Sequence, residues 1–243
     1  MIIRPQQRSP RAVPDPRIAP PRLVDLLAPH LTPRRLKRMR RIVAQRLASI
    51  TVLIERPYDP HNAAAVLRSA EALGLSHVHI VPHERRFDFS SQVTQRADKW
   101  LDVYLHDDVE QAATFLRAAG FRLAGALAPP KDARERDAPP AALPVDAPLA
   151  IVLGNEHEGL TPRARALCDA HFSLPMFGFS ESYNLSVSAA LVLSDVTTRR
   201  RARLGRRGDL PARARTRLEA AYLVRAVSFA ERLVLRELGL DAR

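Results

Sequence analysis

Short apolar segments alternate with amphipathic, helix-like segments through the middle of the chain. The apolar segments, which predict buried strands, are 51–55, 77–81, 101–105, 121–127 and 149–153. The segments 62–73 and 109–119 have helical periodicity, and each is followed by a glycine of the kind that ends helices. Strands and helices that alternate in this way are typical of an α/β protein with a mostly parallel sheet.

The composition is that of a soluble, globular protein. The 243 residues are 46% hydrophobic, which is enough for a sizeable core and predicts one domain with extensions. No apolar run approaches the roughly 20 residues that a membrane-spanning helix needs, and the N-terminus lacks the apolar region of a signal peptide. We therefore expect a cytoplasmic protein without a membrane partner.

The sequence contains no pattern of metal ligands. Its single cysteine, Cys168, excludes an intramolecular disulfide framework and a cluster of thiolate ligands. His77 and His79 alternate along one predicted strand, and no further ligand cluster lies at a suitable spacing. We expect these histidines to be half-buried strand residues, and we expect no metal site.

The positive charge is concentrated at the two ends of the chain. The formal net charge is +12, which divides into +9 for residues 1–61, −5 for 62–195 and +8 for 196–243. Arginine supplies most of the surplus, and its planar guanidinium group suits bidentate contacts to phosphate. This distribution predicts that the flanks bind a polyanion such as RNA. An arginine-rich composition would explain the preference for arginine over lysine, but not its segregation.

The basic flanks have different predicted structures. Residues 1–30 are rich in proline and arginine without periodicity, and we expect no regular structure there. Residues 31–48 contain Thr32 and Pro33, a typical helix start, and then one apolar stripe among many basic residues. Such a helix is either a solvated surface helix or an RNA-contacting arm. The arginines expected to contact RNA are Arg34, Arg35, Arg38 and Arg41 here and Arg199, Arg200, Arg201 and Arg203 in a helical extension at 199–243.

An acidic loop follows the predicted strand at 149–153. Gly154 and Gly159 bound this loop, and Glu156 and Glu158 lie between them. In a parallel α/β sheet, ligands bind just beyond the carboxyl ends of the strands. The two glutamates would repel a phosphate group, so the loop favours a neutral or cationic ligand. The alternative is a structural turn whose acidic side chains are solvated.

The stretch 174–193 has the pattern of a tight loop that leads directly into a helix of small residues. Proline, glycine and serine interrupt its first half, and Ser182 or Asn184 can cap the helix. Serine and alanine dominate the first two helical turns, so another backbone or a ligand can approach closely. The alternative is an ordinary cap in front of a buried helix.

The predicted helix that begins at Asn62 has an unusual outer face. Arg68 lies among alanines, where a solvated helix of so basic a protein would normally carry several charges. A ligand or a second subunit can approach an arginine in this setting. An ion pair between Arg68 and Glu71 is the simpler alternative.

Three segments of the chain resemble the motifs of one enzyme family. They are HNAAAVLRSAEALG at 61–74, IVLGNEHEGL at 151–160 and LPMFGFSESYNLSVSAALVL at 174–193. In order and spacing they are similar to the motifs of the SpoU/TrmH family of SPOUT RNA 2′-O-methyltransferases, and most similar to its tRNA (guanosine-2′-O-)methyltransferases. The basic helix just before the first motif and the Arg-rich extension after the third favour these tRNA enzymes over relatives that modify ribosomal RNA.

The resemblance implies a fold, a cofactor and an assembly. The implied fold is the SPOUT α/β fold, with a mostly parallel sheet in a domain at 49–198 and a deep trefoil knot near its C-terminal end. The implied enzyme is a homodimer that transfers a methyl group from S-adenosylmethionine to a ribose of tRNA, most closely the D-loop guanosine (Gm18). Two alternatives stay open, namely methylation of ribosomal or another structured RNA, and a non-catalytic RNA-binding protein on the same scaffold.

The resemblance also assigns roles to individual residues. The catalytic positions are Arg68, Asn62, Glu156 and Asn184, and Arg68 matches the arginine proposed to deprotonate the ribose 2′-hydroxyl. The positions implied for S-adenosylmethionine are Gly125, Leu153, Gly154, Leu174, Met176, Tyr183 and Leu185. Tyr183 departs from the family pattern, which commonly has leucine there, and it adds bulk and a hydroxyl group beside the cofactor.

Overall fold

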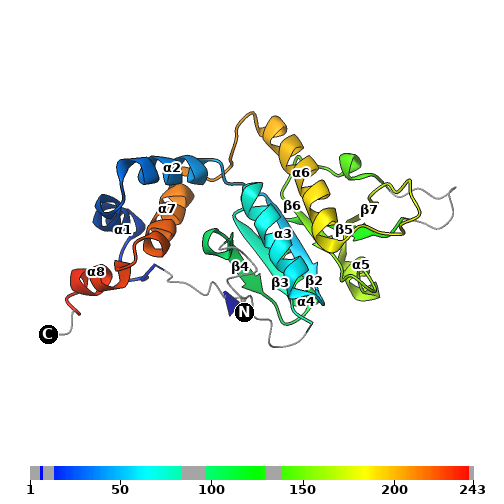
Figure 1. Ribbon diagram of the computed structural model, residues 1–243, viewed down its shortest axis with the longest axis horizontal. Coiled ribbons are helices and arrows are strands. Elements are labelled where there is room, and N and C mark those ends of the chain that lie inside the picture. The colour runs from blue at the N-terminus through cyan, green and yellow to red at the C-terminus, as the bar shows by residue number, and fades with distance from the viewer. Residues whose placement is uncertain (1–5, 8–13, 84–96, 130–137, 241–243) are drawn as a thin grey trace. The chain divides into compact units, whose positions relative to one another are not determined.

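The computed structural model describes residues 6–7, 14–83, 97–129 and 138–240. The chain forms two compact units, and Figure 1 labels their α-helices and the strands β2 to β7. The sheet unit comprises residues 1–8 and 47–206, and the helical unit comprises residues 9–46 and 207–243. Within the described ranges, each helix is too short or too polar to cross a lipid bilayer. The same ranges contain no group of three or more His, Cys, Asp or Glu side chains that could hold a metal ion.

The sheet unit is built on a seven-stranded sheet with the strand order β1-β4-β3-β2-β6-β5-β7. Every neighbouring pair is parallel except β1 and β4, which confirms the predicted mostly parallel sheet. The sequence did not predict β7, because four residues with one buried aromatic side chain show no clear alternation. The strands are β1 (Gln6–Gln7), β2 (Ile50–Glu55), β3 (His77–Val81), β4 (Asp102–Leu105), β5 (Arg122–Leu127), β6 (Leu149–Leu153) and β7 (Ala170–Ser173).

Helices cover both faces of this sheet. They are α3 (Pro60–Ala72), α4 (Val109–Ala118), α5 (Pro162–Leu167) and α6 (Leu185–Leu204), with the 3₁₀ turns η2 (Ala97–Trp100) and η3 (Pro140–Ala142). Successive residues of a strand point to opposite faces. Val52 and Ile54 of β2 therefore join the core that contains residues of α3 and α6, whereas Leu53 joins the core that contains residues of α4 and α5. All residues of β2 are buried, as expected for a central strand covered on both faces.

Two of the helix caps that the sequence predicted, Thr32 and Asn184, are confirmed, and Thr161 caps α5. Helix α3 instead begins at Pro60, and Asp59 caps it by accepting a hydrogen bond of 2.8 Å from the backbone N–H of His61. The predicted cap, Asn62, is therefore inside the first turn of the helix, and its side chain is available for other contacts.

The helical unit combines segments from both ends of the chain. It contains α1 (Pro20–Leu27), the 3₁₀ turn η1 (Ala28–His30), α2 (Pro33–Ala44), α7 (Ala212–Ala226) and α8 (Ala230–Glu237). Helix α1 packs against α7, and its Leu23 and Leu27 are fully buried. The expectation that residues 1–30 lack regular structure is therefore wrong for residues 20–30, and strand β1 contradicts it at residues 6–7. The burial of this short, proline-rich segment depends on a helix at the other end of the chain, which no local pattern shows.

The two basic flanks are thus parts of one unit rather than separate extensions. Helices α2 and α7 pack together, and an ion pair of 2.7 Å joins Arg40 of α2 to Glu219 of α7. Helix α6 continues to Leu204 and ends at Gly205, whose φ of 61° lies in the left-handed region that favours glycine. The predicted domain boundary between residues 198 and 199 therefore falls inside a helix.

Candidate active site

A cavity of about 290 Å³ lies at the carboxyl ends of β5, β6 and β7. Its walls come from residues 126–129 at the end of β5, from residues 153–160 after β6, and from parts of 172–192 between β7 and α6. Ligands of open α/β sheets bind at this edge. The cavity therefore lies where the acidic loop predicted a ligand.

Six of the seven residues implied for the cofactor line this cavity. They are Leu153, Gly154, Leu174, Met176, Tyr183 and Leu185. Gly125 is not among the lining residues, although the next two residues, Ala126 and Leu127, are. A Cβ atom at Gly125 would lie 2.9 Å from both Sγ of Cys168 and Cδ1 of Leu160. Gly125 is therefore needed for close packing behind the cavity wall.

The loop after β6 is held closed by its own backbone. Asn155 and Gly159 exchange two backbone hydrogen bonds of 3.2 and 3.1 Å. A Cβ atom at Gly154 would collide with the backbone of Gly159, so this closure requires a glycine. Oδ1 of Asn155 accepts hydrogen bonds from the backbone N–H groups of His157 at 3.0 Å and Glu158 at 2.8 Å.

Asn155 also presents a donor that sequence reasoning missed. The residue is only 6% exposed and lines the cavity, and its Nδ2 has no hydrogen-bond partner within the described residues. A buried amide N–H that lacks a hydrogen-bond partner raises the free energy of the folded state. This group is therefore suited to donating a hydrogen bond to a ligand in the cavity. The acidic neighbours of Asn155 drew attention to this loop, but nothing in the sequence distinguished the asparagine itself.

A buried carboxylate anchors the far end of the same loop. Glu55, the last residue of β2, is 2% exposed and accepts hydrogen bonds from the N–H of Thr161 at 2.9 Å and from its Oγ1 at 2.7 Å. Oγ1 of Thr161 also caps α5 by accepting from the N–H of Ala164 at 3.1 Å. The loop is therefore attached to the central strand at the point where α5 begins.

A chain of side-chain hydrogen bonds joins the three sequence motifs beside the cavity. Nδ2 of Asn62 donates to Oε1 of Glu156 at 2.8 Å, and Nδ2 of Asn184 donates to Oδ1 of Asn62 at 2.9 Å. Oδ1 of Asn184 accepts from the N–H and Oγ of Ser186 at 2.8 and 2.7 Å. The structure thus brings together three of the four implied catalytic residues, and we call Asn62, Glu156 and Asn184 the amide network.

The surroundings of Glu156 keep its carboxylate ionised. Burial acts to raise its pKa, but hydrogen bonds from the Asn62 side chain and the Tyr58 backbone N–H outweigh this effect, and the pKa lies below the usual value for glutamate. An ionised carboxylate only accepts hydrogen bonds. Glu156 therefore orients the Asn62 amide, with Nδ2 toward Glu156 and Oδ1 toward Asn184.

Comparisons with known proteins agree with this geometry. The SpoU rRNA Methylase family model matches residues 49–194. The chain belongs to this family. A tRNA (guanosine(18)-2′-O)-methyltransferase of Thermus thermophilus is 32% identical over 171 residues, which cover 70% of this chain and 84% of the relative. The protein of the same name from Escherichia coli K12 is 30% identical over 172 residues, which cover 70% and 72%.

Solved structures of SpoU proteins have the same fold. The TrmH/SpoU tRNA modifying enzyme of A. aeolicus matches with a TM-score of 0.68 and 23% identity, and the match covers 78% of this chain and 95% of that chain. The SpoU methyltransferase AviRb of Streptomyces viridochromogenes matches with a TM-score of 0.54 and 27% identity, over 65% of this chain and 61% of that one. The SPOUT α/β fold is therefore confirmed, and the trefoil knot stays a prediction.

Arg68, the fourth catalytic position implied by the SpoU motifs, lies apart from the amide network. It is exposed on α3 and does not line the cavity. Within the described residues, its guanidinium group makes no hydrogen bond or ion pair, so the expected alternative of a pair with Glu71 is not formed. The group is available to RNA or to a second subunit.

The arginines expected to contact RNA fall into two groups in this SpoU protein. The exposed group is Arg34, Arg35, Arg38 and Arg41 in α2 and Arg203 in α6. In contrast, Arg200 is 8% exposed and donates to Oγ of Ser49 at 2.9 Å. Arg199 pairs with Asp195 at 2.7 Å, and Arg201 donates to a backbone carbonyl at 2.7 Å. These contacts of residues 199–201 hold α6 within the sheet unit and argue against the expected role in RNA binding.

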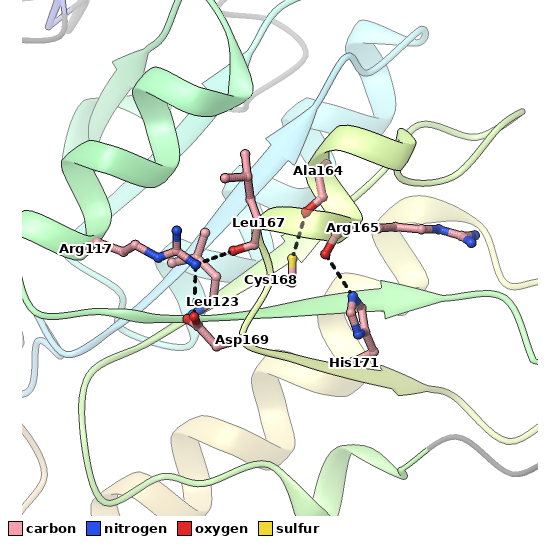
Figure 2. Close-up of polar contacts among 8 residues, drawn as sticks. All are labelled: Arg117, Leu123, Ala164, Arg165, Leu167, Cys168, Asp169 and His171. Atoms are coloured by element: carbon pink, nitrogen blue, oxygen red, sulfur yellow. Dashed lines mark hydrogen bonds and ion pairs between the residues drawn. The ribbon is translucent and has the colours of Figure 1, made fainter.

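The connection between α5 and β7 holds the single cysteine in a structural position. Figure 2 shows Asp169 accepting hydrogen bonds from the N–H of Leu123 at 2.8 Å and from Arg117 at 2.9 Å. Sγ of the neighbouring Cys168 donates to the carbonyl oxygen of Ala164 at 3.2 Å. Burial raises the pKa of the Cys168 thiol to about 12, so the thiol stays protonated and unreactive at neutral pH.

Proposed function

We propose that this protein is an S-adenosylmethionine-dependent tRNA 2′-O-methyltransferase and that its target is the guanosine at position 18 of the D-loop. The observation that carries this proposal is the amide network beside the cavity, where one residue from each SpoU motif meets the others. The names of the T. thermophilus and E. coli relatives support tRNA, and this guanosine, as the substrate.

The residues of the cavity fit S-adenosylmethionine. Phe172 and Leu185 line it with apolar surface suited to a purine ring. Glu158 and Glu181 also line it, and carboxylates favour the positive charge of a sulfonium group. The unpartnered Nδ2 of Asn155 provides a hydrogen-bond donor. When bound, S-adenosylmethionine supplies an electrophilic methyl group for the ribose 2′-oxygen, and the reaction requires no metal.

The amide network positions the target nucleotide. Each of the amides of Asn62 and Asn184 uses one N–H within the network and keeps a second N–H that no described residue accepts. These two donors bind oxygens of the target nucleotide, while Glu156 prevents the Asn62 amide from rotating. Orientation of this kind supplies a large part of the rate acceleration in group transfer.

Arg68 organises removal of the 2′-hydroxyl proton. A guanidinium group stays protonated at neutral pH, so Arg68 does not act as a free base. Its planar donors instead bind a phosphate and the ribose together, and the 2′-hydroxyl proton passes to solvent water as the methyl group is transferred. This role requires Arg68 to reach a ribose that is held at a cavity.

A homodimer brings Arg68 into such a position. Val187 and Leu191 are 43% and 46% exposed on α6, in a shallow depression that also includes Ser69 of α3. Phe177 and Phe179, in the loop before α6, are almost wholly exposed. Exposed apolar surface of this extent marks an interface. A second copy of the chain covers it, and two-fold symmetry gives each cavity an Arg68 from the partner.

The resemblance to the SpoU/TrmH family also supports proposals about tRNA binding, the knot and the cellular location. Arg34, Arg35, Arg38, Arg41 and Arg203 bind tRNA phosphates, which suits side chains that are exposed and form no ion pair within the described residues. The chain folds with the trefoil knot of the family and works in the cytoplasm, where tRNA is found.

Methylation of a defined transcript tests the proposal. The purified protein, S-adenosylmethionine with a labelled methyl group, and an unmodified tRNA transcript should give one labelled ribose. A transcript with 2′-deoxyguanosine at position 18 should accept no label. Label on the deoxy transcript would show that the methylated ribose is not at position 18. Label on ribosomal RNA fragments but not on tRNA would show that the substrate is ribosomal RNA.

A cellular measurement complements this assay. Nucleotide-resolution mapping of 2′-O-methylated riboses, in cells with and without the gene, should show one tRNA position that depends on the gene. Calorimetry after treatment with a chelator should still detect binding of S-adenosylmethionine. Binding that disappears and returns only with added metal would contradict the metal-free site.

A further inference from the structure

Three aromatic rings meet at the edge of the proposed active site. The ring centroid of Tyr58 lies 4.4 Å from that of His83 and 4.9 Å from that of His157, and both contacts are edge-to-face. These residues follow β2, β3 and β6, which are neighbours in the order β3-β2-β6. We call Tyr58, His83 and His157 the aromatic cluster.

The aromatic cluster shares a carboxylate with the amide network. The backbone N–H of Tyr58 donates to Oε2 of Glu156 at 3.1 Å, while Oε1 of the same carboxylate accepts from Asn62 at 2.8 Å. His157 follows Glu156 directly and lines the cavity. A group that contacts these rings therefore lies next to whatever the amide network holds.

The three rings are accessible and belong to neither core of the sheet unit. Tyr58 is 45% exposed, His157 is exposed and His83 is half-buried. The core clusters of the sheet unit include Phe172 but none of these residues. Exposed rings held at fixed angles form a surface on which RNA bases stack, and such stacking tolerates any base.

Arg56 adds a cation that is unpaired among the described residues, in a strained backbone conformation. It follows β2 directly, and its φ of 51° is the only positive value for a non-glycine residue in the described part of the chain. Pro57 comes next, and a residue before proline favours extended conformations, which adds to the strain. The backbone N–H of Arg56 donates to the carbonyl oxygen of Val81 at 2.7 Å. Strain of this kind persists where the position of a side chain matters for function.

The guanidinium group of Arg56 is not used in the contacts that hold the described part of the sheet unit together. Among the described residues, none forms a hydrogen bond or an ion pair with it. By comparison, Arg117 and Arg163 of the same unit pair with Asp169 and Glu110. A half-buried guanidinium group that is not paired is suited to a phosphate, which it can bind through two parallel hydrogen bonds.

We propose that Arg56 and the aromatic cluster form a binding site for one RNA nucleotide that neighbours the methylated one. The rings stack on the base of this nucleotide, and the Arg56 guanidinium group binds its phosphate. The inference rests on the proposed function, because it takes RNA as the ligand. This nucleotide site gives the RNA a second point of attachment beside the target ribose. It therefore determines which ribose the amide network binds.

The stacking part is tested with Tyr58→Ala and Tyr58→Phe. Fluorescence anisotropy with a labelled, unmodified tRNA transcript should show binding weakened about tenfold by Tyr58→Ala, which is in the range for loss of one stacked base. Tyr58→Phe keeps the ring and should bind like the wild type. Calorimetry should give the same affinity for S-adenosylmethionine in all three proteins. Unchanged tRNA affinity for folded Tyr58→Ala overturns the proposal, as does a loss confined to S-adenosylmethionine binding.

The phosphate part is tested with Arg56→Gly. Glycine adopts a positive φ without strain, so this variant should melt at a higher temperature than the wild type. It should nevertheless bind the tRNA transcript more weakly, and the slope of log K against log salt should fall by about 0.7. Arg163→Ala, which removes an exposed arginine from the same unit, is the matched control and should leave the slope unchanged. An unchanged slope for Arg56→Gly excludes the phosphate contact.

These experiments separate the nucleotide site from the proposed reaction, because they measure binding and not methylation. If the wild type methylates no tRNA but the Tyr58 and Arg56 variants bind tRNA more weakly than it does, the nucleotide site is supported and the proposed reaction is contradicted. If the wild type methylates tRNA and both variants bind tRNA as well as it does, the nucleotide site is contradicted and the proposed reaction is unaffected.

Discussion

Asn62 donates a hydrogen bond of 2.8 Å to Glu156, although 94 positions separate the two residues in the chain. The same amide accepts a hydrogen bond of 2.9 Å from Asn184, which is 122 positions away. Asn62 therefore connects the first turn of α3, the loop after β6 and the cap of α6. A change at Asn62 disturbs all three at once, whereas a change at either partner leaves one connection intact.

Replacement of Asn62 tests whether this connection matters for the reaction. Asn62→Ala removes both hydrogen bonds, and we expect the single-turnover methylation rate to fall by about tenfold or more because the nucleotide is less well oriented. The free energy of unfolding should fall by only about 1 kcal/mol, as for the loss of a partly exposed hydrogen bond. Rapid-quench assays and urea titrations measure the two effects. A normal rate for folded Asn62→Ala would remove the network from the mechanism.

Arg68 should affect the rate but not the stability. Its side chain is exposed and makes no hydrogen bond or ion pair with the described residues, so Arg68→Ala should change the free energy of unfolding by at most about 0.5 kcal/mol. The single-turnover rate should fall by about 100-fold, the range for losing a group that assists proton transfer. Arg68→Lys should restore little, because an ammonium group cannot hold a phosphate and a ribose in one plane. A wild-type rate for Arg68→Ala in a folded dimer would contradict this role.

Arg200 and Arg203 should behave in opposite ways although they lie three residues apart. Arg200 is 8% exposed and donates to Ser49 and to two backbone carbonyl oxygens, so Arg200→Ala should lower the free energy of unfolding by about 2 to 3 kcal/mol. Arg203 is exposed, and Arg203→Ala should leave stability within about 0.5 kcal/mol. It should instead lower the salt slope of tRNA binding by about 0.7. Thermal melts and salt titrations on both variants distinguish the two roles, and equal stabilities would contradict the assignment.

The exposed face of α6 should control assembly. Leu191 is 46% exposed, and Leu191→Arg would place two like charges together across a two-fold axis, so we expect the dimer to dissociate at micromolar concentration. Methylation should be lost with the dimer, because each cavity loses the partner subunit's Arg68. Arg122→Ala changes an exposed residue at the start of β5, outside the depression that contains Leu191, and is the control. Sedimentation velocity that finds the wild type monomeric would contradict the dimer.

Two buried histidines should make stability depend on pH. Nδ1 of His79 and Nε2 of His106 lie 2.9 Å apart, and both side chains are buried. Burial lowers the pKa of His79 well below its usual value and that of His106 to about 4. In the unfolded chain a histidine has a pKa of about 6.5, so below that pH the unfolded state binds more protons than the native state. The free energy of unfolding should therefore fall as the pH drops from about 6.5 toward about 4, by up to about 1.4 kcal/mol per pH unit for each histidine.

Urea titrations across this pH range measure the effect. His106→Gln removes one of the two titrating groups while it keeps a polar side chain, so its curve should be flatter than that of the wild type. A wild-type stability that stays constant between these two pH values would contradict the prediction.

The sequence by itself determined the fold class and most of the element positions. Continuous apolar segments such as 149–153 predict strands covered on both faces, and the structure has β6 at those residues. The helix starts at Thr32, Thr161 and Asn184 were likewise predictable, because a cap bonds to a backbone N–H only a few residues away. Family motifs identified the residues of the amide network, although they could not show how these residues bond.

Only the tertiary structure decided which side chains meet and which are buried. Asn62 fits the sequence pattern of a cap, but Asp59 takes that role and the Asn62 amide bridges two distant motifs. Arg200 and Arg203 belong to one basic run, yet only Arg200 is buried. Leu23 and Leu27 are buried because α7 packs on them from the other end of the chain. In each case the deciding partner is distant in sequence, and local periodicity carries no information about which distant segments the folded chain brings together.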